Sequence, residues 1–574
     1  MLAFVNGLPP AAVGLLALLA LIAAALVWER GQRNRLLARL RARWGRPAPV
    51  ARYPEVIGGY HRWLAQQRAP DASIDERTAA DLHFEELFAA VDHTLSGIGR
   101  QVLYDRLRHA EPPPDSALVG HLADRVTGDA ALRERLQLLL VRLEDTATYG
   151  LWQLTMPGAI PTDPRMAVLP FLTAGIVGSM VAIPFFPPAT LALIGFVVVG
   201  LLLRTSLGWK LNWLLPTVRQ LAGFLAVAKR LARVQHGSER VATGVDAADV
   251  IQVEGIRKLA RWAGGDRTGA GGELLAMFQE YLNLVLLLDG NVLFFASRQL
   301  ERKADVILRL LGAVGRVDTA LAIASYRSSV RWVRPRLDRD RSGPVPLELR
   351  ALRHPLLDNP VPNDLTVGAE RGMVVTGSNM SGKSTYLRTV GVTVVMAQTM
   401  ETCLADRYSA PVLRVRSAIG RSDDLLAGKS YYLAEVEAVI EMVTRSAEPT
   451  PTLMLFDELF RGTNAVERIA AGAAVLRELL DRAAGASPHV VLVATHDGEL
   501  VDLLADHGYR PVHFEESVDA EGISFDYLLK PGPARTRNAI ALLEQRGAPA
   551  RLIETARTLA VDLDRSRGGV EPAT

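Results

Sequence analysis

The sequence is poor in cysteine, poor in aromatic side chains and almost balanced in charge. Its 574 residues include one cysteine, Cys403, which excludes an intramolecular disulfide and a multi-cysteine metal site and fits a reducing compartment. We expect Cys403 to be a buried small apolar residue. A formal net charge of +3 excludes a chain that binds nucleic acid through overall charge alone. Any basic surface must therefore be local.

Charged residues are also missing from a stretch near the N-terminus, residues 11–28, which is close to the roughly 20 apolar residues of a membrane helix. No charged residue precedes it, whereas basic residues follow. This order predicts a membrane anchor over residues 1–28, with the basic linker 29–77 in the cytoplasm, rather than a cleaved signal peptide. The arginines that follow fit a topology signal and lipid contact, with DNA binding as the alternative. They are Arg30, Arg33, Arg35, Arg39, Arg41, Arg43 and Arg46.

A second stretch without charge runs from Met166 to Leu203 and is broken by prolines at 184, 187 and 188. Two short membrane spans joined by a turn fit it best, so we predict a transmembrane hairpin over residues 166–204. Arginine at both ends places both flanks in the cytoplasm and the prolines near the outer face. The alternative is a buried helical hairpin in the core of a soluble protein.

Apolar residues three and four apart predict helices in the rest of the N-terminal part. We expect a helical core in two pieces, residues 78–160 and 205–332. Breaks are expected at Gly264–Gly272 and at Asp289–Gly290. The polar, arginine-rich stretch 331–344 is typical of a linker.

The pattern changes in the C-terminal domain, which we assign to residues 345–574. Short apolar runs at 373–376, 452–456 and 489–494 alternate with helical patterns. Continuous apolar strands of this length are what a parallel sheet requires, because helices cover both of its faces. An α/β domain is therefore expected here, preceded by the all-α core.

The first of these runs leads into a sequence that matches G-x-x-x-x-G-K-[ST] between a predicted strand and a predicted helix. Such a loop wraps phosphates with backbone N–H groups, while Lys383 neutralises the β and γ phosphates of ATP and the Ser384 hydroxyl binds Mg²⁺. The residues expected to bind ATP are Gly377, Ser378, Asn379, Met380, Ser381, Gly382, Lys383, Ser384 and Thr385.

The other two runs end in residues that suit ATP hydrolysis. If the strand at 452–456 lies beside the P-loop strand, Asp457 is expected to hold Mg²⁺ and Glu458 to act as the general base toward water. His496 follows the third run, where a histidine can contact the γ-phosphate and the attacking water. We therefore predict Glu458 and His496 as catalytic and Ser384 and Asp457 as metal ligands.

Three motifs resemble those of the MutS family and occur in the same order. They are Thr376–Tyr386, Asp457–Thr463 and Ala494–Leu500. Shorter stretches are also similar to MutS: Arg353–Pro355, Asn363–Asp364, Ser422–Asp424, Gly428–Ser430, Tyr527–Gly532 and Asn538–Ile540. The resemblance covers residues 350–560 well. Upstream it is limited to Asp92–Gly99 and Asp318–Ser325, which look like pieces of the MutS helical core and lever.

The resemblance implies an ABC-type ATPase that works as a homodimer. In that family each ATP is completed by a segment of the other subunit, which implies that Ser430 reaches the partner's γ-phosphate. DNA is the implied ligand and mismatch repair the implied process. The chain departs from the family pattern in the parts that read DNA. Residues 1–77 resemble no mismatch-reading module, and the hairpin 166–204 interrupts the region of the lever and the DNA clamp. Phe84 and Phe514 begin Phe-x-Glu spellings that we attribute to chance.

Together these observations predict a MutS-like ATPase anchored in the cell (inner) membrane through residues 11–28 and 166–204. Its ATPase domain is expected to face the cytoplasm. ATP hydrolysis would change the spacing of the helical arms of a dimer. The alternative is a membrane-bound ABC-type ATPase that acts on a protein or envelope partner and has no role on DNA.

Overall fold

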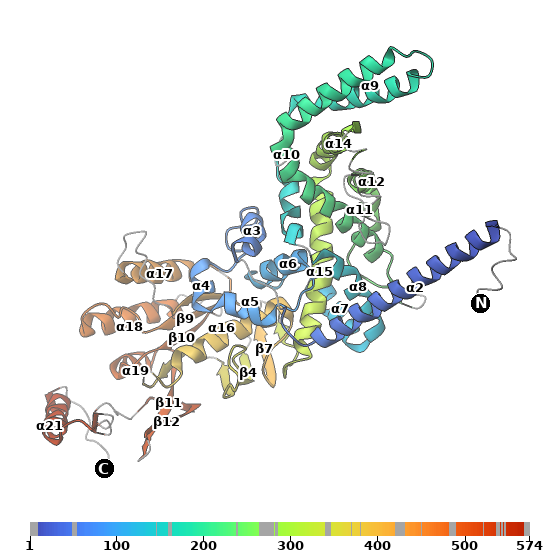
Figure 1. The fold of residues 1–574 in the computed structure, drawn as a ribbon. Coiled ribbons are helices and arrows are strands. Elements are labelled where there is room, and N and C mark those ends of the chain that lie inside the picture. The colour runs from blue at the N-terminus through green and yellow to red at the C-terminus, as the bar shows by residue number, and fades with distance from the viewer. Residues whose placement is uncertain are drawn as a thin grey trace. The chain divides into compact units, whose positions relative to one another are not determined.

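The computed structural model describes most of the chain. The described residues are 10–48, 54–144, 146–158, 163–236, 239–262, 281, 285–338, 346–368, 370–378, 380–419, 431–448, 450–481, 489–519, 522–534, 540, 543–544 and 547–566. Figure 1 shows its helices and strands.

The chain divides into two compact units, each assembled from separate stretches. The helical unit comprises Met1–Gln67, Val91–Arg106 and Asp115–Ser329, and the sheet unit comprises Arg68–Ala90, Leu107–Pro114 and Val330–Thr574. The domain boundaries drawn from the sequence remain predictions. The contacts nevertheless assign two short early stretches, 68–90 and 107–114, to the unit that contains the P-loop.

The helical unit consists of helices joined by short turns, in line with the apolar spacing. Its helices are α2 (Pro10–Arg43), α3 (Pro54–Ala65), α6 (Gly97–Leu107), α7 (Ser116–Gly128), α8 (Ala130–Leu140), α9 (Leu169–Ala182), α10 (Ala189–Leu231), α11 (Ala247–Gln252), α12 (Glu254–Trp262), α14 (Leu288–Arg302) and α15 (Ala304–Arg327). Three 3-10 helices accompany them: η1 (Val141–Leu143), η2 (Thr146–Thr155) and η3 (Pro164–Val168). A two-stranded hairpin that the spacing did not predict joins β1 (Gln235–His236) to β2 (Glu239–Arg240).

One of the two expected helix breaks lies two residues earlier than predicted, at Leu287, whose left-handed backbone (φ 52°) separates the helical residues 285–286 from α14. Asp289 and Gly290 follow it in the first turn of α14. The first turn tolerates them because its N–H groups have no partner within the helix. The other expected break, Gly264–Gly272, lies outside the described residues.

A buried carboxylate joins the two upstream stretches that resemble MutS. Asp318 of α15 is fully buried and accepts hydrogen bonds from the backbone N–H groups of Leu95 (3.0 Å) and Ser96 (2.8 Å) and from the Ser96 hydroxyl (2.6 Å). Burial raises the pKa of Asp318, and these hydrogen bonds oppose that effect. A Cβ atom at Gly99 would lie 2.1 Å from the Asp318 Oδ2 atom, so the close approach requires glycine.

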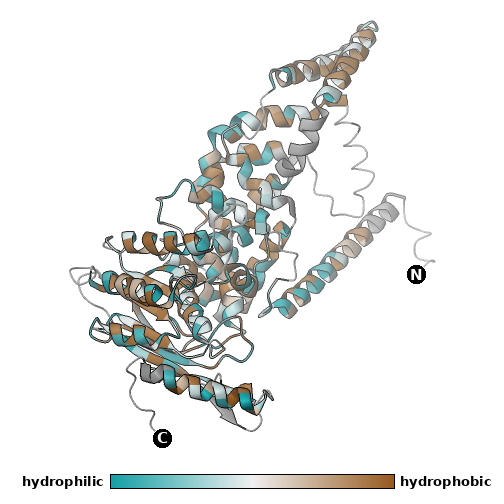
Figure 2. Cartoon of the chain, turned by 90° about the vertical axis from the view of Figure 1, so that its left-hand side faces the viewer, coloured by the Kyte–Doolittle hydropathy of each residue, from teal (hydrophilic) through white to brown (hydrophobic). Residues whose placement is uncertain are grey.

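Helices α9 and α10 form the helical hairpin expected over 166–204, with its turn at the prolines. In the described part of the chain, Pro164–Ala182 and Ala189–Ser206 are long and apolar enough to cross a membrane by length and composition. Only 28% and 11% of these segments are buried, so most of the hairpin lies outside the unit's own core, although Leu169 and Ile176 of α9 are buried. Figure 2 shows the apolar residues along it.

Two of the arginines that follow the N-terminal apolar run are held within the helical unit. Arg41 at the end of α2 binds Glu134 of α8 through two nitrogen atoms, at 2.6 and 3.0 Å. Arg43 donates to the Thr94 carbonyl oxygen at 2.9 Å. These contacts fix the C-terminal end of α2, a structural role that the charge pattern alone did not indicate.

The sheet unit contains two sheets. Its strands are β3 (Arg336–Asp338), β4 (Leu347–Leu352), β5 (Asn363–Val367), β6 (Gly372–Thr376), β7 (Arg407–Pro411), β8 (Arg414–Ala418), β9 (Thr452–Asp457), β10 (Val490–Ala494), β11 (Tyr509–Asp519) and β12 (Gly522–Pro531). The larger sheet has the order β12-β11-β6-β10-β9-β8, parallel except for the β11–β12 pair. The smaller sheet has the order β3-β7-β4-β5.

The three apolar runs are β6, β9 and β10, and they pair in parallel as expected. One detail is wrong, because β10 lies between β6 and β9, so Asp457 does not follow the neighbour of the P-loop strand. The helical crossovers between strands decide strand order, and no local pattern records it. The predicted linker is also partly wrong, since β3 lies within it and pairs with β7.

Helices cover both faces of the larger sheet, as continuous apolar strands require. On one face, α17 (Tyr431–Arg445), α18 (Ala465–Asp481) and α19 (Gly498–Leu504) bury a common core with β6, β9 and β10. On the other face α16 (Lys383–Met400) packs closely enough that a Cβ at Gly391 would lie 2.8 Å from the Leu455 side chain. The early helices α4 (Glu76–Asp81) and α5 (Phe84–Val91) and the late helix α21 (Ala550–Ser566) complete the described helices of this unit.

Candidate nucleotide site

The P-loop connects β6 to α16 and depends on two glycines. Gly377 and Gly382 have φ angles of +139° and +103°, which side chains rarely adopt. A Cβ at Gly377 would lie 2.7 Å from the Ser381 Oγ atom and 2.9 Å from the Phe514 carbonyl oxygen. The loop therefore needs glycine at 377 for space as well as for conformation.

Lys383 opens α16 and turns its side chain back over the loop. Its Nζ atom donates to the carbonyl oxygens of Gly377 and Ser378, each at 2.7 Å. Burial lowers the pKa of Lys383, and the charges of Glu458 and Asp457 oppose that effect. The ammonium thus lies over the loop, where the sequence predicted that it meets phosphate oxygens.

Backbone hydrogen bonds tie the ends of the three central strands together. The Glu458 N–H donates to the Ala494 carbonyl oxygen at 2.9 Å, and the Thr495 N–H donates to that of Val375 at 3.0 Å. Strands β9, β10 and β6 consequently end at one edge of the sheet. Residues that directly follow them share this edge, which is where α/β sheets bind ligands.

The two predicted metal ligands meet at this edge. The Ser384 hydroxyl donates to the Asp457 Oδ2 atom at 2.5 Å, although the two residues come from different elements, α16 and β9. Burial raises the pKa of Asp457, and the hydrogen bond from Ser384 opposes this rise. A hydroxyl and a carboxylate in contact are oxygen donors that suit Mg²⁺.

Glu458 is buried, 7% exposed, and is held from two sides. Its Oε1 atom lies 3.2 Å from the His496 Nδ1 atom, and Arg461 pairs with its Oε2 atom. The hydrogen bond to Glu458 raises the pKa of His496. The two residues predicted as catalytic are therefore in contact.

The turn after β9 is held in an uncommon conformation. Glu458 and Phe460 have φ angles of +56° and +58°, although neither is glycine. Each such residue costs on the order of 1 kcal/mol or more, and such costs concentrate at functional sites. Glu435 of α17 accepts a hydrogen bond from the Phe460 N–H and helps to hold this turn.

Two predicted residues, Asn379 and Ser430, lie outside the described residues. Of the remaining loop residues, Ser381 is buried, as Lys383 is, whereas Met380 is 76% exposed. Thr385 is exposed in the first turn of α16.

Several charged residues around the site had no predicted role. Arg461 lies three residues after Glu458 and forms an ion pair with it, a contact that this short spacing in the sequence could have indicated. Arg468 of α18 pairs with Asp497 at 2.8 Å and so holds the residue that follows His496. No local pattern indicated that second pair, because 29 residues separate its members.

Neither Phe-x-Glu spelling exposes its phenylalanine. Phe84 in α5 is 2% exposed and Phe514 on β11 is 3% exposed, and Phe514 packs edge-on against Tyr386. Both side chains belong to the core of the sheet unit, as expected for chance spellings.

Comparison with known proteins agrees with this geometry. Residues 373–564 match the family described as MutS domain V. The DNA mismatch repair protein MutS of Thermus aquaticus is 27% identical over 518 residues, which cover 84% of this chain and 62% of that protein. MutS of Geobacillus kaustophilus is 31% identical over 291 residues, and MutS 2 of Haloarcula marismortui is 29% identical over 306 residues. Each of these two matches covers 49% of this chain and 31% of the relative.

Proposed function

We propose that this chain is a MutS-family ATPase that hydrolyses ATP to ADP and phosphate and acts on DNA, because residues 373–564 match MutS domain V and its relatives include DNA mismatch repair proteins. The chain spans less than two thirds of the length of these relatives. ATP hydrolysis is therefore argued from the site itself, and action on DNA from the relatives. The observation that carries it is the meeting of Lys383, Ser384, Asp457, Glu458 and His496 at one sheet edge.

Each side chain has a part that its position supports. Lys383 neutralises phosphate oxygens, and the backbone N–H groups of the loop bind them. The Glu458 carboxylate takes the proton of the attacking water, while His496 and Arg461 hold that carboxylate in place. The residues also fit Mg²⁺, because Ser384 and Asp457 already present adjacent oxygen atoms. When bound there, the ion supplies charge that stabilises the phosphates.

DNA binding and dimerisation extend the proposal to the whole chain. The printed names of the relatives describe DNA mismatch repair proteins, which supports DNA as the ligand. A homodimer follows from the family's composite site, in which Ser430 would complete the partner's ATP. Mismatch recognition is not part of the proposal.

A membrane location is a further part of the proposal. The hairpin of α9 and α10 is long enough, apolar enough and largely exposed, as a lipid-facing hairpin must be. Phe171, Phe185 and Leu191 are 76%, 86% and 75% exposed. We infer that residues 11–28 and 166–204 hold the protein in the cell (inner) membrane, with the ATPase domain in the cytoplasm.

The same hairpin supports a second candidate function. A membrane-bound ATPase that drives a protein or envelope partner needs the same nucleotide site and the same exposed apolar helices. The two candidates differ in one measurable property, because only the first binds DNA through phosphate contacts that weaken with salt.

The first test compares the full chain with a Glu458→Gln variant in detergent. The amide holds a water molecule but cannot take its proton, so turnover should fall at least about 100-fold while ATP affinity stays within about threefold. The matched control is Glu467→Gln, which removes the charge of an exposed side chain on α18 and should keep parental turnover. Turnover of Glu458→Gln close to that of the parent would remove Glu458 as the base.

The DNA arm measures duplex binding and ATP turnover at rising salt. Binding that declines with salt, with a change in turnover on DNA, supports the proposal. Absence of both in an active ATPase would favour the second candidate.

A further inference from the structure

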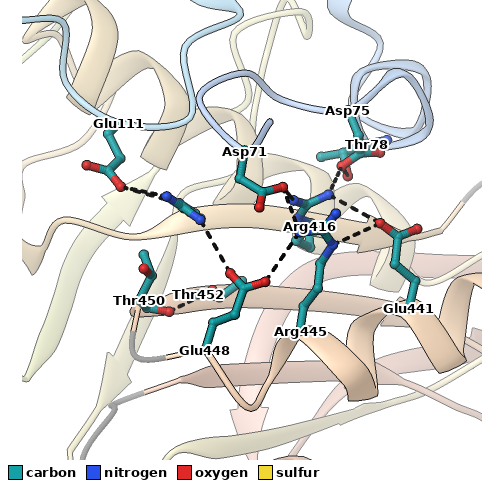
Figure 3. A network of polar contacts seen from close by, with 11 residues as sticks. Asp71, Asp75, Thr78, Glu111, Arg416, Glu441, Arg445, Glu448, Thr450 and Thr452 are labelled. Atoms are coloured by element: carbon teal, nitrogen blue, oxygen red, sulfur yellow. Dashed lines mark hydrogen bonds and ion pairs between the residues drawn. The ribbon is translucent and has the colours of Figure 1, made fainter. Parts of the chain in front are cut away.

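A segment from early in the chain packs on the sheet unit near the nucleotide site. This segment, residues 68–90, carries α4 and α5. Arg416 on β8 pairs with Asp71 at 2.9 Å and Asp75 at 3.0 Å, and Arg445 at the end of α17 pairs with Asp71 at 2.6 Å. Figure 3 shows these acidic and basic side chains gathered over β8 and α17.

These ion pairs are partly shielded from solvent and share partners. Burial alone would raise the pKa of Asp71, but Arg445 with Arg416 and Arg414 holds it below its ordinary value. Several charges that share partners form a network, which fixes geometry better than an isolated pair does. The network therefore holds the start of the segment against the edge strand of the larger sheet.

The segment then makes three hydrogen bonds with the end of β8. The Ser417 N–H donates to the Thr78 Oγ1 atom at 3.0 Å, and the Ser417 hydroxyl donates to the Asp81 Oδ2 atom at 2.7 Å. The Ile419 N–H donates to the same Asp81 oxygen at 2.8 Å. Asp81 is 6% exposed, so a buried carboxylate terminates this strand.

Asp81 also contacts α16, the helix that follows the P-loop. The Arg388 Nε atom donates to the Asp81 carbonyl oxygen at 2.8 Å. Arg388 lies one turn beyond Ser384 on the same face of α16. The next residue of the segment, Leu82, would lie 2.8 Å from a Cβ at Gly391, so the segment and α16 are in close contact.

Asp81 therefore touches α16, which carries one of the two metal-ligand candidates, and β8, which pairs with the strand that carries the other. Ser384 lies on α16, and Asp457 ends β9, the parallel neighbour of β8. In that register Ala418 is opposite Phe456, the residue before Asp457. The 2.5 Å contact between Ser384 and Asp457 depends on how α16 sits against this edge of the sheet.

We propose that Asp81 is a positioning residue for nucleotide turnover, which holds α16 and the β8–β9 edge at the spacing that Ser384 and Asp457 need to bind Mg²⁺ together. The inference rests on the proposed ATPase function and deepens it. Asp81 is not among the residues predicted to bind nucleotide or metal, and it acts through Arg388, Ser417 and Ile419. Its carboxylate matters because two donors, a hydroxyl and an N–H, point at one buried oxygen.

The test uses the full chain with Asp81→Asn. Loss of the charged acceptor should lower kcat about tenfold and raise the Mg²⁺ concentration for half-maximal turnover about tenfold, as for other residues that orient metal ligands. Nucleotide affinity without Mg²⁺ should stay within about twofold, because the loop and Lys383 are unchanged. A purely structural role would lower the thermal midpoint without moving the Mg²⁺ requirement.

Glu76→Gln is the matched control, since Glu76 lies on the same helix and pairs with Arg108 rather than with β8. It should keep the parental kcat and Mg²⁺ requirement. A folded Asp81→Asn protein with parental values, or one with lower kcat and an unchanged Mg²⁺ requirement, would overturn the proposal.

Ser417→Ala decides the question if Asp81→Asn does not fold, because it removes one of the two donors to the carboxylate. It should raise the Mg²⁺ requirement about threefold, the effect of one hydrogen bond. An unchanged requirement in Ser417→Ala would overturn the inference. A parent protein that does not hydrolyse ATP would instead contradict the proposed function, so the two failures are distinguishable.

Discussion

At the scale of single residues, side-chain contacts organise the nucleotide site. The Glu458 carboxylate contacts His496 and Arg461, and the Ser384 hydroxyl contacts Asp457. Charged groups that are fixed in advance need little rearrangement when charge develops in the transition state. The left-handed backbone at Glu458 is part of this arrangement, because it sets where the side chain leaves β9.

Lys383 has a role that can be separated from that of Glu458. Changing Lys383 to Ala removes the charge expected to face the β and γ phosphates, so ATP should bind about 100-fold more weakly. Equilibrium binding of a fluorescent ATP analogue measures this directly. The control is Lys530→Ala on β12, which removes a lysine that pairs with Glu515 and Asp526. This variant should bind ATP as the parent does. Unchanged affinity in Lys383→Ala would refute the assignment.

At the scale of elements, the sheet unit depends on stretches that are distant in sequence. The segment 68–90 supplies Asp71, Asp75 and Asp81 to the edge of the larger sheet. A fragment that began after the α9–α10 hairpin would lack these contacts. Biochemical work on the nucleotide site should therefore use the full chain.

The hairpin of α9 and α10 yields a topology prediction that uses the chain's single cysteine. Cys403 is 0% exposed, so a cysteine introduced on the surface is the accessible thiol among the described residues. Phe185 is in the turn and 86% exposed. If the turn is near the outer face, Phe185→Cys should react with a membrane-impermeant maleimide in intact cells.

The matched control is Thr205→Cys, at an exposed position directly after Arg204. It should react only after the cells are permeabilised, because the arginine at 204 keeps that end in the cytoplasm. The parent chain should stay unlabelled in both conditions. Recovery of the protein in the soluble fraction without detergent, or labelling of both cysteines only after permeabilisation, would contradict the membrane-spanning hairpin.

At the scale of the whole molecule, the proposed composite site links dimerisation to catalysis. A Ser430→Arg subunit should prevent turnover of the ATP bound to its partner, and a Lys383→Ala subunit should prevent turnover at its own nucleotide site. In a mixed dimer both defects fall on the ATP of the Lys383→Ala subunit, so the other ATP remains usable. Mixing the two inactive proteins should therefore restore part of the ATP turnover.

The mixing experiment needs two controls, subunit exchange and single-site turnover. Mixtures of the parent with an excess of Lys383→Ala provide the second, and labelled subunits provide the first. With both controls satisfied, a mixture without activity would show that Ser430 does not act in trans. The alternative from the sequence, a loop serine that caps the following helix, would then be favoured.

The sequence by itself predicted the residues of the site and determined the positions of its three central strands. Each predicted part of the site follows a short apolar run within two residues, and β6, β9 and β10 form at those runs. These parts are the loop from Gly377 to Ser384, the pair Asp457 and Glu458, and His496. These features are local, because a buried parallel strand needs continuous apolar residues and a phosphate loop needs glycine at fixed spacing. The apolar hairpin between Arg165 and Arg204 was predictable for the same reason.

Only the tertiary structure decided which distant residues share the site. The insertion of β10 between β6 and β9 depends on helical crossovers, and the pairing of β3 with β7 joins residues more than 70 positions apart. The contacts of Asp81 with Arg388 and Ser417 span more than 300 positions. Such contacts form because buried polar groups must find partners once the chain has folded, and no local pattern records which partners they find.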